Sequence, residues 1–96
     1  MGRDQMHKIS DTVRTAHSQD GAIVLDVRQG QMFNLNLVGS RILELLRGGH
    51  SEVEIVDRIS REFDVSRNVV EGDLREFLEA LKNHKLIEDQ QAGKTA

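Results

Sequence analysis

The chain has 96 residues, of which 38% are hydrophobic and 30% charged, and its formal net charge is −3. This length allows one domain with a single modest core and excludes a substrate pocket walled by two domains. The chain has no membrane-length apolar run, no hydrophobic signal core and no cysteine. This composition predicts a cytoplasmic protein that is not embedded in a membrane. The acidic net charge argues against a nucleic-acid partner, subject to how the charges are distributed.

The patterned part of the chain lies between two polar segments. We expect flexible tails at residues 1–8 and 89–96 around one domain of residues 9–88. Weak alternation predicts a first strand at residues 12–17, and stronger alternation predicts a second at residues 22–27. The domain therefore begins as a small antiparallel meander.

A hairpin is predicted next, with the loop Arg28-Gln29-Gly30. Gly30 can adopt a positive φ at low cost, which suits a three-residue hairpin loop. This loop places Ile23, Leu25 and Val27 on one buried face with Phe33 and Leu35. The third strand then enters a helix that Asn36 caps. If this strand lies at a sheet edge, its unpaired backbone can bind an extended peptide.

Three helices are predicted after the strands, so the element order is βββααα and the fold class is α+β. The first ends at Gly48-Gly49, the second opens with the capping box Ser51–Glu54, and the third begins after Ser66. Their apolar stripes are Val38, Ile42, Leu45 and Leu46; Ile55, Val56, Ile59 and Phe63; and Val70, Leu74, Phe77, Leu78 and Leu81. Leu86 and Ile87 then close the core.

Catalytic and metal-binding patterns are missing from the sequence. The four histidines lie in a tail, a weak strand, a loop and a helix end, without the spacing of metal ligands. No nucleophile and base form a recognisable set, so we expect no enzyme activity, no metal and no cofactor. The helix–turn–helix order leaves a winged-helix DNA-binding regulator as the alternative. A single basic face of Arg75, Lys82 and Lys85 would favour that alternative.

The third predicted helix carries small and polar residues beside its apolar stripe, namely Val69, Asp73, Glu76 and Ala80. If this flank faces the edge strand, the two form a groove that suits an extended peptide. The same pattern also fits a half-exposed helix boundary, and spacing alone leaves both interpretations open. A third possibility is a dimerising module, in which a second copy of the chain occupies the strand edge.

The sequence also resembles the PqqD-like proteins, which recognise the precursors of ribosomally made, modified peptides. The resemblance covers residues 13–88 and rests on Asp26, Gly30, Phe33, Leu35-Asn36, Gly39, Ile42, Leu45, Gly48, Ile55, Ile59, Phe63, Val65, Asp73, Phe77-Leu78, Leu81 and Leu86-Ile87. It implies a winged-helix-like fold in which a precursor's leader segment adds a strand beside the third strand and packs on the third helix. Leu43 and Met32-Phe33 depart from the family's frequent tryptophan and tyrosine, which obscures the subfamily.

Site residues and partners follow from this resemblance. It implies strand pairing by Gln31, Met32, Phe33, Asn34 and Leu35, with Val69, Asp73, Phe77 and Ala80 as the opposite wall. Phe77 is alternatively a core residue. The implied partners are a precursor leader peptide and a modifying enzyme, which is a radical SAM enzyme, a leader peptidase or a cyclase. We expect the protein itself to be a monomer or a weak homodimer.

Overall fold

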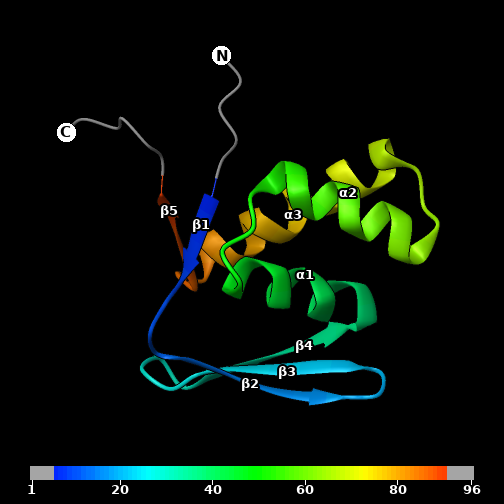
Figure 1. The fold of residues 1–96 in the computed structure, drawn as a ribbon. Helices are drawn as coiled ribbons and strands as arrows, with labels where there is room; N and C mark the ends of the chain where they lie inside the picture. Colours follow the sequence, from blue (N-terminus) through cyan, green and yellow to red (C-terminus); the bar gives the residue numbers. More distant parts are fainter. Residues whose placement is uncertain (1–5, 91–96) are drawn as a thin grey trace.

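The computed structural model describes residues 6–90 of the chain, and it consists of a three-stranded sheet, three helices and a small two-stranded sheet. Figure 1 shows the helices stacked on one face of the larger sheet. The elements are β1 (Met6–Ile9), β2 (Val13–Ser18), β3 (Gly21–Asp26), β4 (Gln31–Asn36), α1 (Leu37–Arg47), α2 (Glu52–Phe63), α3 (Arg67–Asn83) and β5 (Ile87–Gln90). The antiparallel order β2-β3-β4, followed by three helices, confirms the predicted α+β fold.

The face of β3 that packs on the helices is the opposite of the predicted one. Val24 is only 1% exposed and lies opposite Phe33, whereas Ile23 and Val27 are 43% and 51% exposed. The hairpin loop has four residues, 27–30, and Asp26 pairs with Gln31. A shift of the strand pairing by one residue moves every side chain of a strand to the other face of the sheet. The three-residue loop therefore placed the wrong side chains of β3 on the buried face.

The buried carboxylate of Asp26 explains the longer loop. Its Oδ1 accepts hydrogen bonds from the backbone N–H of Arg28 at 3.0 Å and Gln29 at 3.4 Å, and from Thr12 Oγ1 at 3.0 Å. Gln29 Nε2 donates to the other carboxylate oxygen and also, at 3.0 Å, to the carbonyl of His84. An aspartate that bonds the next N–H groups initiates a turn. Asp26 thus joins the start of β2, the hairpin and the end of α3.

We expect the charge of Asp26 to make the fold sensitive to acid. Burial raises the pKa of Asp26, but hydrogen bonds from Gln29, Thr12 and the Arg28 N–H outweigh it and lower the pKa below its ordinary value. A carboxyl with a lowered folded-state pKa stabilises the fold fully above its unfolded pKa of about 3.9 and loses that contribution as pH falls through the folded pKa. Asp26→Asn should therefore unfold at lower urea concentration at neutral pH and lose less stability than the wild type on acidification. If the wild type and Asp26→Asn lost equal stability on acidification, this prediction would be wrong. Asp11→Asn is the control, because it removes an exposed carboxylate.

The predicted helix ends are confirmed. Asn36 Oδ1 accepts from the Gly39 N–H at 2.8 Å, and Ser51 and Glu54 form the predicted capping box. Helix α1 contacts β3 and β4 on one side and α2 on the other, so it buries more than the predicted stripe. Leu43, for example, is only 2% exposed.

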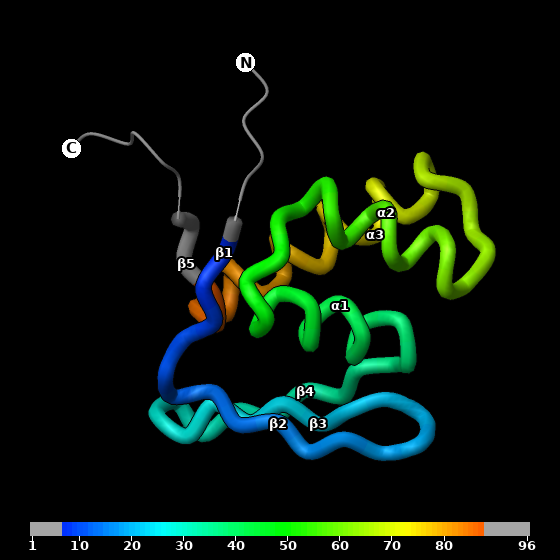
Figure 2. The backbone as a smooth tube through the Cα atoms, viewed as in Figure 1, coloured from blue at the N-terminus to red at the C-terminus, as the bar shows by residue number. Residues whose placement is uncertain are grey.

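Strands β1 and β5 extend the domain into both predicted tails. Residues 6–8 and 89–90 pair in one antiparallel ladder, so they do not form tails, while residues 1–5 and 91–96 lie outside the described residues. His7 anchors β1, because its ring is buried and Nε2 lies 2.6 Å from Glu52 Oε2 on α2. Figure 1 shows β1 and β5 side by side at one end of the helices, and Figure 2 shows the chain passing from β1 to β2 in the sheet. The buried Leu86 and Ile87 close the core as predicted.

Candidate functional site

The two edges of the larger sheet, β2 and β4, differ in how they are covered. Arg47 of α1 reaches the β2 edge, where its Nη2 donates to the Val13 carbonyl at 3.3 Å and to Thr15 Oγ1 at 3.0 Å. Among the side chains of residues 7–87, none hydrogen-bonds to the backbone of residues 31–35. Because every second residue of an edge strand directs its N–H and C=O away from the sheet, β4 offers a free row of donors and acceptors.

The side chains of β4 divide between the two faces of the sheet. Phe33 and Leu35 are half-buried against the core, whereas Gln31, Met32 and Asn34 are exposed. Side chains alternate along a strand, so Met32 and Asn34 lie on the outer face, away from the helices. A partner beside β4 would therefore meet Met32 and Asn34 through their backbone and meet Phe33 and Leu35 through their side chains.

The C-terminal end of α3 lies at the start of β4. The ring centroids of His84 and Phe33 are 4.5 Å apart, and the planes are tilted by 53°. Gln29 fixes this approach through its bond to the His84 carbonyl. Sequence reasoning missed His84, because nothing local to a helix end indicates a partner about fifty residues away.

A cavity of about 440 Å³ lies where the end of β4, the start of α1 and the middle of α3 meet. We call it the α1–α3 pocket; it is lined by Asn36, Val38, Gly39 and Ile42 and, from α3, by Asp73, Glu76 and Phe77. Gly39 leaves this space open, since a Cβ there would lie 3.6 Å from both Phe77 Cε1 and Leu35 Cβ. Phe77 is half-buried against the core, which fits the alternative prediction of a core residue, and it also lines the pocket.

The structure brings together only part of the predicted site. Asp73 and Phe77 line the α1–α3 pocket, which begins where β4 ends. Val69 and Ala80 are exposed on α3 but do not line the pocket. Asn36, Val38 and Gly39 were not among the predicted site residues, although a glycine within an amphipathic helix is the signal that could have indicated them.

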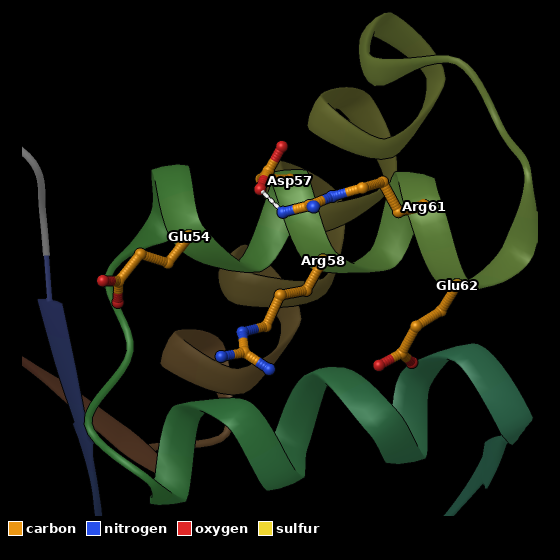
Figure 3. Close-up of a pocket in the computed structure, with 5 residues that line it drawn as sticks. All are labelled: Glu54, Asp57, Arg58, Arg61 and Glu62. Carbon is orange, nitrogen blue, oxygen red and sulfur yellow. Dashed lines mark hydrogen bonds and ion pairs between the residues drawn. The ribbon is translucent and has the colours of Figure 1, made fainter.

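A second cavity, on the surface of α2, is lined entirely by charged residues (Figure 3). Asp57 pairs with Arg61 on the same helix and, at 3.1 Å, with Arg67 of α3. The two carboxylate oxygens of Glu62 instead accept hydrogen bonds from the guanidinium of Arg41 on α1, at 2.9 and 2.8 Å. This bond raises the pKa of Arg41 and lowers that of Glu62. These pairs bridge the helices, and the cavity holds no nucleophile with an adjacent base.

A third cavity, of about 490 Å³ between α2 and α3, tests the DNA-binding alternative. Its charged lining consists of three basic and three acidic residues, namely Arg67, Arg75 and Lys82 with Glu52, Glu71 and Glu79. The basic residues are thus interleaved with acids, and this part of the described surface forms no single basic face for a phosphate backbone. The structure gives the regulator no support.

Among the side chains of residues 7–87, no group of three or more histidine, cysteine, aspartate and glutamate residues could hold a metal ion. None of the helices in the same range is both long enough and apolar enough to cross a membrane.

Comparisons with known proteins agree with this geometry. The family model for coenzyme PQQ synthesis protein D (PqqD) matches residues 21–87. The solved structure of TbiB1 in complex with the TbiA(beta) leader peptide is 45% identical, covers 93% of this chain and 99% of its own, and has a TM-score of 0.77. A lasso peptide synthetase B1 complexed with the leader peptide, at 24% identity, covers 85% and 96% with a TM-score of 0.77 and shows the shared fold.

A PqqA binding protein from Methylococcus capsulatus is 40% identical over 58 residues. The match covers 60% of this chain and 60% of that relative's length. The residues that the family model matches include β4, α1 and α3.

Proposed function

The chain belongs to the PqqD family, and we propose that it captures the leader segment of a ribosomally made precursor peptide and presents it to a separate modifying enzyme. The observation that carries this proposal is the free edge of β4 beside the α1–α3 pocket. The leader complex of a relative with 45% identity over nearly the whole chain supports it.

Capture is by strand addition. The leader pairs with the backbone of residues 31–35, and alternate leader side chains face Phe33, Leu35 and Phe77. A main-chain hydrogen bond contributes only about 0.5–1.5 kcal/mol net, and ordering a flexible leader opposes binding. Apolar leader anchors must therefore supply much of the affinity, and the half-buried aromatic side chains of Phe33 and Phe77 offer the surface for them.

The proposed adaptor acts by tethering rather than by chemistry of its own. Bound leader holds the core of the precursor near the enzyme and raises its effective concentration there. We assign no catalytic residue and no cofactor to this chain. The enzyme is a radical SAM enzyme, a leader peptidase or a cyclase, and capture takes place in the cytoplasm, where precursors leave the ribosome.

Fluorescence anisotropy with labelled leader peptides tests this function. The probes are the TbiA(beta) leader and the leaders of small open reading frames next to the gene for this chain, with a DNA duplex as control. We expect saturable leader binding, with a Kd on the order of micromolar, and no duplex binding at physiological salt. Duplex binding without leader binding would overturn the proposal.

Backbone N-methylation of the leader tests strand addition separately. Each methyl group removes one N–H donor without changing a side chain, so we expect losses of about tenfold at every second position and small effects between them. The protein is unmodified in this scan, so unfolding cannot explain a loss. An effect without alternation would contradict pairing with β4.

The free edge also predicts how copies of the chain associate. We expect a monomer or a weak homodimer in sedimentation velocity, because an unpaired strand edge can pair with another edge. Leader binding occupies β4, so saturating leader should dissociate a dimer formed through that strand. A dimer that persists with leader bound would place its interface elsewhere.

A further inference from the structure

The α1–α3 pocket combines an apolar interior with an anionic margin. Val38, Ile42 and Phe77 supply apolar lining, and Gly39 leaves the space between α1 and α3 open. A side chain that fills this pocket must therefore carry an apolar stem. An aliphatic chain of several carbons meets that requirement.

The margin of the pocket is negatively charged. Asp73 and Glu76 are exposed and lie three residues apart on α3, so they share one face of the helix. Among the side chains of residues 7–87, neither carboxylate has an ion-pair or hydrogen-bond partner. The described part of the chain places no lysine or arginine in the pocket lining, so both charges are available to a ligand.

We propose that the α1–α3 pocket selects an arginine or lysine of the leader, whose stem packs on Phe77 and whose cationic end lies between Asp73 and Glu76. This inference rests on the proposed function and adds the chemical class of one leader residue. The pocket begins at Asn36, where β4 becomes α1. The selected residue therefore lies at one end of the added strand.

Other side chains fit the pocket less well. A leader glutamate would face two like charges and be repelled. A leucine would cover the apolar lining but leave both carboxylates without a counter-charge. An arginine or lysine satisfies both parts, because its aliphatic stem is apolar and its end is charged.

A charge-exchange experiment tests the inference. Each position of the bound leader is replaced in turn by arginine, glutamate and norleucine, and anisotropy is measured with the wild type and with the double variant Asp73→Lys/Glu76→Lys. We expect one terminal position of the paired segment at which the wild type prefers arginine to glutamate by about fivefold or more, a ratio that falls with added salt. The double variant should reverse that preference at the same position.

Glu71→Lys/Glu79→Lys is the matched control, since it makes the same charge change on α3 but in the groove shared with α2. It should keep the wild-type preference, and circular dichroism should show all variants folded. Saturable leader binding with no position reversed by Asp73→Lys/Glu76→Lys would overturn the inference and leave the proposed function standing. Absence of binding to any leader by the folded wild type would overturn both.

Discussion

Replacing Gly39 by leucine is expected to block leader capture while the domain remains folded. A Cβ at this position would lie 3.3 Å from Asn36 Oδ1, which must shift by a few tenths of an ångström, and 3.6 Å from Phe77 and Leu35. The rest of the side chain has the α1–α3 pocket to occupy. The leader would then have to displace it, and overpacking of this kind costs about 1–3 kcal/mol, or roughly 5- to 150-fold in Kd. Anisotropy with a leader that binds the wild type measures the loss.

Two variants separate a blocked pocket from a general effect on the helices. Gly39→Ala adds only the Cβ, which lies 3.3 Å from Asn36 Oδ1, so we expect a smaller loss than with leucine. Gly72→Leu makes the same change in α3, where an added Cβ meets nothing within 4 Å, and should leave Kd unchanged. Wild-type affinity of a folded Gly39→Leu protein would show that the leader does not use this pocket.

Gly21→Ala is expected to produce the largest loss of stability. Gly21 starts β3 with a φ of +152°, and a Cβ there would lie 1.9 Å from the carbonyl oxygen of Leu35. That oxygen belongs to the backbone of β4, so the two strands would have to separate. We expect the free energy of unfolding to fall by at least about 3 kcal/mol, since strain and overpacking each cost about 1–3 kcal/mol.

Gly30→Ala is the matched control for Gly21→Ala in urea denaturation. Gly30 also has a positive φ, +71°, but an added Cβ meets nothing within 4 Å. Only the backbone cost remains, which is about 1–2 kcal/mol for a left-handed L-residue. Equal losses in the free energy of unfolding for the two variants would mean that the contact with Leu35 does not contribute to the destabilisation by Gly21→Ala.

The helices were the most predictable part of the fold. The Asn36 cap, the Ser51–Glu54 capping box and the helix end before Gly48 all depend on residues within four positions of one another. The faces of α1 were less predictable, because its contacts with both the sheet and α2 bury Leu43 beyond the expected stripe.

The sheet shows where pattern reading failed. Alternation indicated β3 correctly but not its buried face, because that face depends on whether the hairpin loop has three residues or four. The buried Asp26 decides this by bonding the N–H groups of Arg28 and Gln29. Strands β1 and β5 carried too little periodicity to be found, since each is stable only when paired with the other end of the chain.

The sequence by itself determined the order of β2, β3, β4 and the three helices, together with the helix caps, because these follow from local hydrogen bonding and hydrophobic periodicity. Tertiary structure alone decided which face of β3 is buried, that Arg47 covers the β2 edge, and that Gly39 and Phe77 enclose a pocket beside Asp73 and Glu76. Those features depend on contacts between residues distant in the chain. No local pattern encodes such contacts, because they form only when the helices pack on the sheet.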